Sequence, residues 1–154
     1  MSEVEDIDLS GMLSAGRITD LLGRSKHAVI EELVELMATS ENITRREAFR
    51  RAVLDREAIM STGIGLGIAI PHARLRSVKD FVIAVGRSKH PIAYDAFDGE
   101  PVFIVIMIAA NENQQQEYLK VVAKLIRVLR DSSSRRRVLE AAGPEEVMQI
   151  LVEG

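Results

Sequence analysis

Apolar residues recur at three- and four-residue spacing in several stretches of the chain, which predicts amphipathic helices. The first covers residues 25–39, with Ser25 in the position of an N-cap. The second covers residues 44–56 and opens on Thr44 and Glu47, the spacing of a capping box. The longest covers residues 115–130, and the side chains expected to face inward are Leu119, Val122, Leu125, Ile126 and Leu129.

Two further helices are expected near the C-terminus, where Gly143 separates a short helix ending near residue 142 from a last helix beginning at Pro144. Two segments, residues 81–85 and 102–109, are nearly continuous apolar runs, typical of strands buried on both faces. A loop is expected between them. The patch at residues 18–22 fits a strand or a helical turn. Helices on both sides of a few buried strands predict an α/β sandwich.

A glycine-rich stretch, residues 61–73, separates the second helix from the first buried strand. Its glycines stand at every second position and allow backbone or an anion to approach closely. Pro71 cannot donate to a sheet, so we expect a loop feeding a very short strand that ends at His72. A neutral imidazole is nucleophilic at cellular pH. From this pattern alone His72 is either a hydrogen-bonded structural residue or a reactive one.

Composition narrows the class of protein. The 154 residues predict a single domain over residues 11–154, preceded by a loose acidic segment at residues 1–10. A net charge of −3 gives no electrostatic case for nucleic-acid binding, and the absence of cysteine excludes thiolate chemistry. The longest apolar run is far shorter than the roughly 20 residues a membrane helix needs. Without a signal peptide, a cytoplasmic protein is expected.

The central stretch also resembles a known signature. Ser61-Thr62-Gly63-Ile64-Gly65, continued by Gly67-Ile68-Ala69-Ile70-Pro71-His72, is similar to the active-site segment of enzyme IIA domains of the bacterial phosphotransferase system. The likeness is to the fructose/mannitol type (type 2), and within it to the nitrogen-regulatory branch. It continues in residues 54–57, 91–102 and 116–119. The glycine spacing matches neither a dinucleotide-binding fingerprint nor a P-loop.

This resemblance implies a central mixed β-sheet flanked by helices on both faces. It also implies that His72 accepts a phosphoryl group on a ring nitrogen from HPr or a nitrogen-branch HPr-like protein. Arg56 matches the arginine that lies near the phosphohistidine and would pair with phosphoryl oxygens. Backbone amides would help to hold the phosphate along the loop residues Ser61, Thr62, Gly63, Gly65 and Gly67. The resemblance implies no cofactor and no metal.

Two positions depart from the family pattern. Tyr118 stands where many members have a second histidine, and Leu66 stands where asparagine is usual. Three functions therefore remain open: a regulatory phosphocarrier, a stand-alone sugar-specific IIA component, or a IIA-like docking module that has lost phosphotransfer. Whether the chain counts as an enzyme depends on that choice. The downstream protein or permease IIB component stays unknown.

Overall fold

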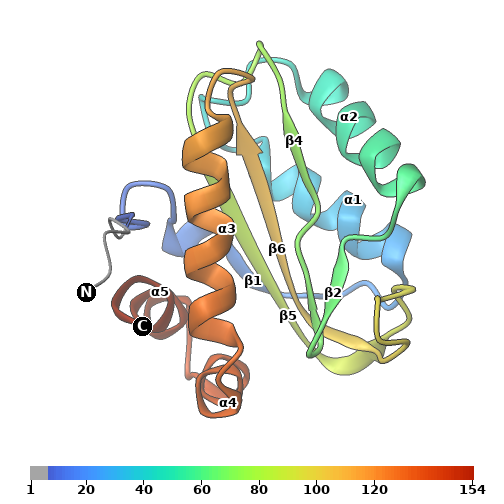
Figure 1. Cartoon of the computed structure of the whole chain (residues 1–154), viewed down its shortest axis with the longest axis vertical. Coiled ribbons are helices and arrows are strands. Elements are labelled where there is room, and N and C mark those ends of the chain that lie inside the picture. The colour runs from blue at the N-terminus through green and yellow to red at the C-terminus, as the bar shows by residue number, and fades with distance from the viewer. Residues whose placement is uncertain (1–6) are drawn as a thin grey trace.

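The computed structural model describes residues 7–154 and shows a six-stranded mixed sheet with helices on both faces (Figure 1). The strands are β1 (Ile18–Asp20), β2 (Gly63–Gly65), β3 (Ile68–Ala69), β4 (His72–Arg74), β5 (Val82–Ile92) and β6 (Val102–Ala110). The helices are η1 (Ala15–Arg17), α1 (Lys26–Met37), α2 (Arg46–Ile59), α3 (Gln115–Leu129), α4 (Ser132–Glu140) and α5 (Pro144–Glu153). The strand order is β1-β5-β6-β3-β2, and β4 also pairs with β6.

Strands β5 and β6 form the antiparallel centre of the sheet, as their apolar sequences predicted. Strand β5 continues to Ile92, so it includes the start of the segment expected to be a loop. The patch left open between strand and helical turn contains β1, which pairs with β5 in parallel. Strands β3 and β4 both run parallel to β6. The sheet is therefore mixed, as the resemblance implied.

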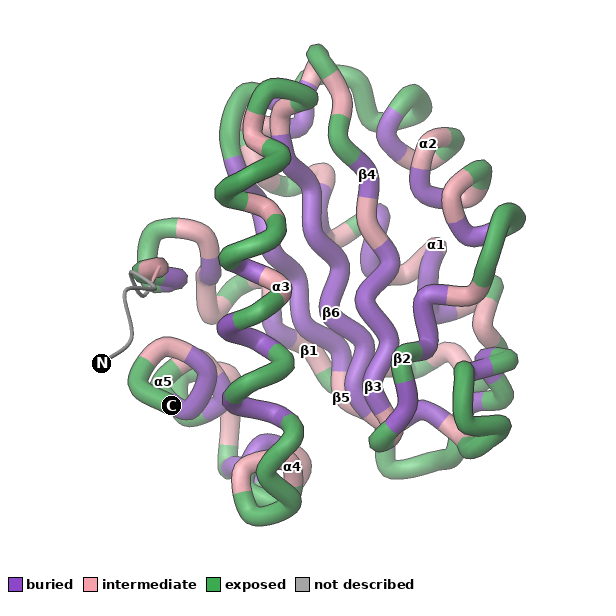
Figure 2. The backbone as a smooth tube through the Cα atoms, viewed as in Figure 1, coloured by how far each residue is buried: buried purple, intermediate pink, exposed green. Residues whose placement is uncertain are grey.

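Strand β6 is buried along most of its length (Figure 2). Its two faces belong to two separate layers of core. Ile104, Ile106 and Ile108 pack on the side of α3, α4 and α5. Val105 and Met107 pack on the side of α1 and α2. Because successive strand side chains point to opposite faces, a continuous apolar run serves both layers. The expected α/β sandwich is confirmed.

The helix starts were predicted with mixed success. Ser25 caps α1, since its Oγ accepts a hydrogen bond from the Ala28 amide at 3.1 Å. The capping box is wrong: Thr44 donates its hydroxyl hydrogen to the Ser77 carbonyl, and Glu47 pairs with Arg50. A tertiary contact therefore takes the Thr44 side chain, and an ion pair within α2 takes the Glu47 side chain. Helix α2 also runs past residue 56, to Ile59.

Helix α3 is rotated relative to the predicted stripe. Leu119 and Ile126, expected to face inward, are 58% and 38% exposed, whereas Val121 and Val128 are buried. The rotation turns Tyr118 toward the sheet, where it packs against the core. The buried face of α3 includes residues with both apolar and polar parts, so the apolar residues alone did not identify it. Large apolar side chains are consequently left on the surface of the helix.

At the N-terminus, residues 1–6 of the segment expected to be loose lie outside the described residues. Leu9, in the same segment, is fully buried in the α3-side core together with Leu13. Across residues 7–154, none of the helices combines the length and hydropathy needed to cross a membrane.

The glycine-rich stretch is a β-hairpin followed by a strand, not a loop that ends in one. Strands β2 and β3 pair antiparallel around a turn at Leu66 and Gly67. Leu66 has φ of 60° and Gly67 has φ of 77°, the left-handed values that a two-residue hairpin turn requires. The expectation that regular structure stops at His72 is wrong, because β4 begins there.

Leu66→Asn is expected to stabilise the fold by about 1 kcal/mol, because asparagine adopts left-handed φ at lower cost than leucine. Urea denaturation followed by circular dichroism measures the change. Leu22→Asn is the matched control, since Leu22 is also exposed (86%) and is not among the residues with positive φ. Equal effects of the two substitutions would contradict the assignment of strain to Leu66.

Candidate functional site

His72 is the first residue of β4, and its ring is held in one orientation by the backbone just before it. Nδ1 lies 3.0 Å from the carbonyl oxygen of Ile70. A carbonyl oxygen can only accept, so Nδ1 carries the hydrogen and Nε2 of the neutral ring carries the free lone pair. The nucleophilic nitrogen of this imidazole is therefore Nε2.

The surroundings of His72 favour the neutral ring. Partial burial lowers the pKa of His72 below its ordinary value of 6.5, and the charges of Arg56 and Arg74 lower it further. The hydrogen bond to Ile70 and the charge of Glu57 act in the opposite direction but are outweighed. An unprotonated Nε2 is thus available at neutral pH.

A cavity of about 330 Å³ opens in front of this ring. Tyr118, from the first turn of α3, forms one wall, with its ring centroid 5.0 Å from that of His72 and the planes 37° apart. Burial raises the pKa of the Tyr118 phenol to about 12, against the influence of the two nearby arginines. The residue at the position of the family's second histidine is therefore uncharged at physiological pH.

Arg56 and Arg74 bring two guanidinium groups to the site. Arg56, in the last turn of α2, donates from Nη1 to the Met60 carbonyl at 2.7 Å and lines the cavity. The structure thus brings His72, Arg56 and Tyr118 together, as expected. Arg74 was missed, although strand periodicity places it on the face of His72, because no strand was expected to start there. Among residues 7–154, neither guanidinium forms an ion pair with a carboxylate.

The predicted phosphate loop divides into two parts. Ser61, Thr62 and Gly63 line the cavity, whereas Gly65 and Gly67 belong to the hairpin and are not among its lining residues. The Thr62 amide donates to Glu57 at 2.8 Å, and the Gly63 amide donates to Ser61 Oγ at 3.1 Å. The amides of Thr62 and Gly63 therefore already have partners, whereas Arg56, which lines the same cavity, has no carboxylate partner among residues 7–154.

Glu57 is a second residue that the sequence reasoning missed. Its carboxylate is buried and accepts from the Thr62 hydroxyl at 2.6 Å, while Lys26 Nζ lies 2.8 Å from its other oxygen. The signal was present: Phe49, Val53 and Glu57 follow one another at four-residue spacing on the buried face of α2. A charged residue in such a series requires a partner from elsewhere in the fold.

Exposed apolar side chains surround the cavity. Met60, Ile64 and Phe97, here called the apolar rim, all line it, and Phe97 is 93% exposed. Leu119 adds a further exposed side chain next to Tyr118. Large apolar groups left in water around a nucleophile are typical of a protein interaction surface.

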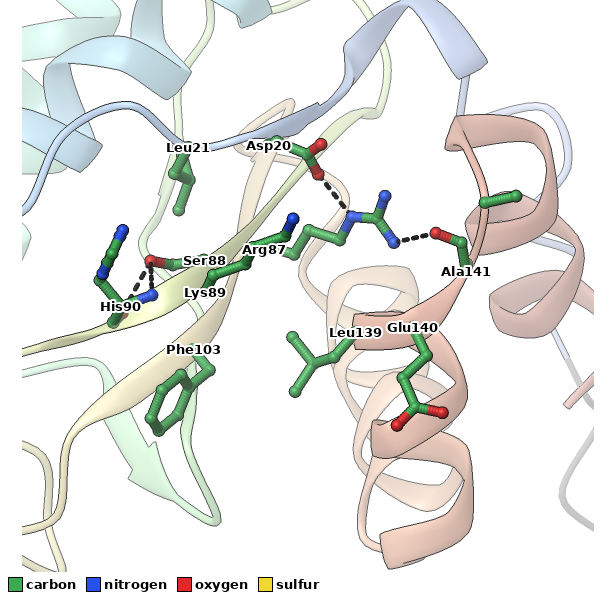
Figure 3. Close-up of a pocket in the computed structure, with 11 residues that line it drawn as sticks. Asp20, Leu21, Arg87, Ser88, Lys89, His90, Phe103, Leu139, Glu140 and Ala141 are labelled. Atoms are coloured by element: carbon green, nitrogen blue, oxygen red, sulfur yellow. Dashed lines mark hydrogen bonds and ion pairs between the residues drawn. The ribbon is translucent and has the colours of Figure 1, made fainter.

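A larger cleft, of about 870 Å³, lies between β5 and α4 (Figure 3). Arg87 spans it, with Nε 2.5 Å from Asp20 and Nη1 2.8 Å from the Ala141 carbonyl. Ser88 is bonded to the backbone of His90. The central polar groups of this cleft join β1, β5 and α4, so they have a structural role, whereas at His72 the ring nitrogen Nε2 keeps its lone pair free.

The sequence and the fold of this chain are similar to those of a known protein family. The family model "Phosphoenolpyruvate-dependent sugar phosphotransferase system, EIIA 2" matches residues 13–154. The "Nitrogen regulatory protein" of Pseudomonas aeruginosa is 31% identical over 148 residues, 96% of each chain. The crystal structure of "Nitrogen Regulatory Protein IIA-Ntr from Neisseria meningitidis" superposes with a TM-score of 0.86 and 31% identity, covering 92% of this chain and 97% of that one.

A further relative, the "PTS system fructose-specific EIIABC component" of Bacillus subtilis, is 38% identical over 128 residues. The match covers 83% of this chain but 20% of that protein, so the chain spans about a fifth of its length.

In an NMR titration, the His72 ring is expected to take up its proton below pH 6.5, because burial and two cations disfavour the imidazolium. Arg56→Ala removes one of those cations and is expected to move the midpoint upward. Arg76→Ala is the control, since Arg76 is 90% exposed and pairs with Glu112. A wild-type midpoint at or above 6.5 would contradict the site described here.

Proposed function

The chain belongs to the EIIA 2 family of the phosphoenolpyruvate-dependent sugar phosphotransferase system, and we propose that it carries a phosphoryl group on Nε2 of His72 as a regulatory protein. The observation that carries this proposal is the free Nε2 of a neutral ring, facing a cavity that Arg56 lines. The charges of Arg56 and Arg74 both act on that ring, and neither guanidinium has a carboxylate partner among residues 7–154. The proposed donor is HPr or a nitrogen-branch HPr-like phosphocarrier.

The chemistry is a transfer between two imidazoles. The Nε2 lone pair attacks phosphorus, the donor's nitrogen–phosphorus bond breaks, and its electron pair stays on the donor nitrogen. If each ring keeps the hydrogen on its second nitrogen, the donor leaves as a neutral imidazole and no water or cofactor is consumed. For His72 that hydrogen stays on Nδ1, bonded to Ile70. The protein's contribution is positioning and charge stabilisation, and the guanidinium of Arg56 would stabilise the charge on the phosphoryl oxygens.

A regulatory role fits the relatives better than a sugar-specific one. The nitrogen regulatory protein of Pseudomonas aeruginosa matches 96% of this chain and of its own length, whereas the fructose-specific EIIA component of Haloferax volcanii matches 84% of each chain. The fructose-specific Bacillus subtilis protein is about five times as long as the matched part. The docking-only alternative is disfavoured by the oriented His72 ring and the nearby Arg56. Tyr118 removes a titrating group but leaves the nucleophile in place.

The apolar rim supports a protein donor rather than a small phosphorylated molecule. Met60, Ile64 and Phe97 surround the nucleophile with surface that a partner would bury on docking. Such a ring excludes water from the centre of an interface, where the reacting nitrogens meet. We infer that the donor phosphocarrier docks on this rim, and that a downstream partner uses the same face in turn.

His72→Ala is expected to abolish acid-labile phosphate incorporation from phosphoenolpyruvate, enzyme I and either HPr or its nitrogen-branch relative. The domain should stay folded, because His72 lies at the mouth of a cavity and not in either core cluster. His27→Ala is the matched control, a histidine with a side chain 68% exposed on α1. Persistent label in His72→Ala would overturn the assignment, and a large loss of melting temperature would contradict the placement of His72.

Phe97→Ala is expected to weaken docking of the phosphorylated donor by about tenfold, because removal of an exposed aromatic anchor at an interface costs more than 1 kcal/mol. The expected signature is a raised KM for the donor with kcat little changed. Leu22→Ala serves as control, since Leu22 is 86% exposed and does not line the His72 cavity. A Phe97→Ala protein with wild-type kinetics would remove Phe97 from the docking face.

A further inference from the structure

Arg74 is a cation placed beside His72 with no carboxylate partner among residues 7–154. Strand periodicity puts His72 and Arg74 on one face of β4, while Ala73 between them is buried in the opposite core layer. The guanidinium carbon of Arg74 lies 5.9 Å from the centroid of the Tyr118 ring, within the range of a cation–π contact. Its neighbour along the chain, Arg76, is instead paired with Glu112 at 3.2 Å.

The charge of Arg74 acts electrostatically on the His72 ring. Arg74 and Arg56 both act on His72 and on Tyr118, lowering the pKa of each group. The two cations come from different elements, β4 and the end of α2, and converge on one uncharged pair of rings. Two like charges that act on one ring repel each other, and the charge of Glu57 offsets this repulsion only in part, since the pKa of His72 stays lowered. A phosphoryl dianion on Nε2 would relieve the repulsion further.

We propose that Arg74 is a second phosphoryl-binding residue of this site and that the ring of Tyr118 holds its guanidinium in place. The proposal rests on the proposed function, because it requires a phosphoryl group on His72. Tyr118 then supplies a surface for the cation rather than a charge or a proton. A guanidinium keeps its charge at every physiological pH, and its planar donors match phosphoryl oxygens.

The test measures phosphoryl transfer from a ³²P-labelled HPr-like donor to the full chain. Arg74→Ala is expected to slow transfer by about tenfold to a hundredfold, the loss expected for a hydrogen bond to a charged group. Arg74→Lys should recover part of the rate, because it keeps the charge but loses the planar donors. Arg76→Ala is the matched control and should stay within about twofold of wild type.

Tyr118 variants separate the ring from the hydroxyl. Tyr118→Phe keeps the ring and is expected to transfer nearly as fast as wild type. Tyr118→Leu removes the ring and should lose about threefold or more. In the Tyr118→Leu background, Arg74→Ala should then cost less than it does in wild type, because the two residues act together. Additive losses would overturn the role given to Tyr118.

A readout that a merely structural role would not move is the ³¹P NMR signal of phosphorylated His72. It is expected to shift in Arg74→Ala and in Arg74→Gln, a neutral variant of similar length, while thermal unfolding stays unchanged. If wild type takes label on His72 and both Arg74 variants react at the wild-type rate, only the inference about Arg74 fails. If wild type takes no label from any donor, the proposed function fails and the inference falls with it.

Discussion

The geometry around His72 depends on one buried carboxylate, that of Glu57. It accepts hydrogen bonds from the amide and the hydroxyl of Thr62, lies 2.8 Å from Lys26 Nζ, and receives the Tyr94 hydroxyl at 3.3 Å. These partners come from α1, from the start of the hairpin and from the segment after β5. Removal of one partner of a buried charge costs about 3–5 kcal/mol, so the turn out of α2 is strongly fixed. That turn presents the Met60 carbonyl to Arg56 and sets Ser61, Thr62 and Gly63 at the cavity.

The remaining site residues are positioned by regular structure. Strand β6 pairs with β4 so that His72 lies opposite Ile108, and the strand then places Arg74 two residues further along the same face. Tyr118 comes from the first turn of α3 and Arg56 from the last turn of α2. The His72 ring therefore sits on a sheet, while Arg56 and Tyr118 sit on helix ends, where side chains reach beyond the layer that carries them. The larger cleft has no such convergence, because Arg87 is bonded to Asp20 and to backbone carbonyls.

The sequence revealed the layers of this fold more fully than its details. Periodicity found α1, α3 and both central strands because each buries several apolar residues, and Ser25 and Pro144 marked helix starts through local chemistry alone. The hairpin was missed because Leu66 takes a left-handed backbone conformation, and leucine is not a residue type that indicates such a turn. The inner face of α3 was misjudged because Lys124 is buried while Leu119 is exposed. Family resemblance pointed to His72, Arg56 and Tyr118, whereas Glu57 and Arg74 depend on contacts between distant segments.

The hydrogen bond from Nδ1 of His72 to the Ile70 carbonyl has a consequence for how a change of state is displayed. A phosphoryl group added at Nε2 leaves that bond intact, so neither the strand nor the residues before it need to move. What changes is the hydration of the surface. The phosphoryl group places on the order of two negative charges, with their bound water, inside the apolar rim. A partner that buries Phe97 and Met60 would then have to strip that water or supply a cation of its own. The phosphorylated and unphosphorylated forms would thus differ in the charge and hydration of this surface, while the backbone stays unchanged.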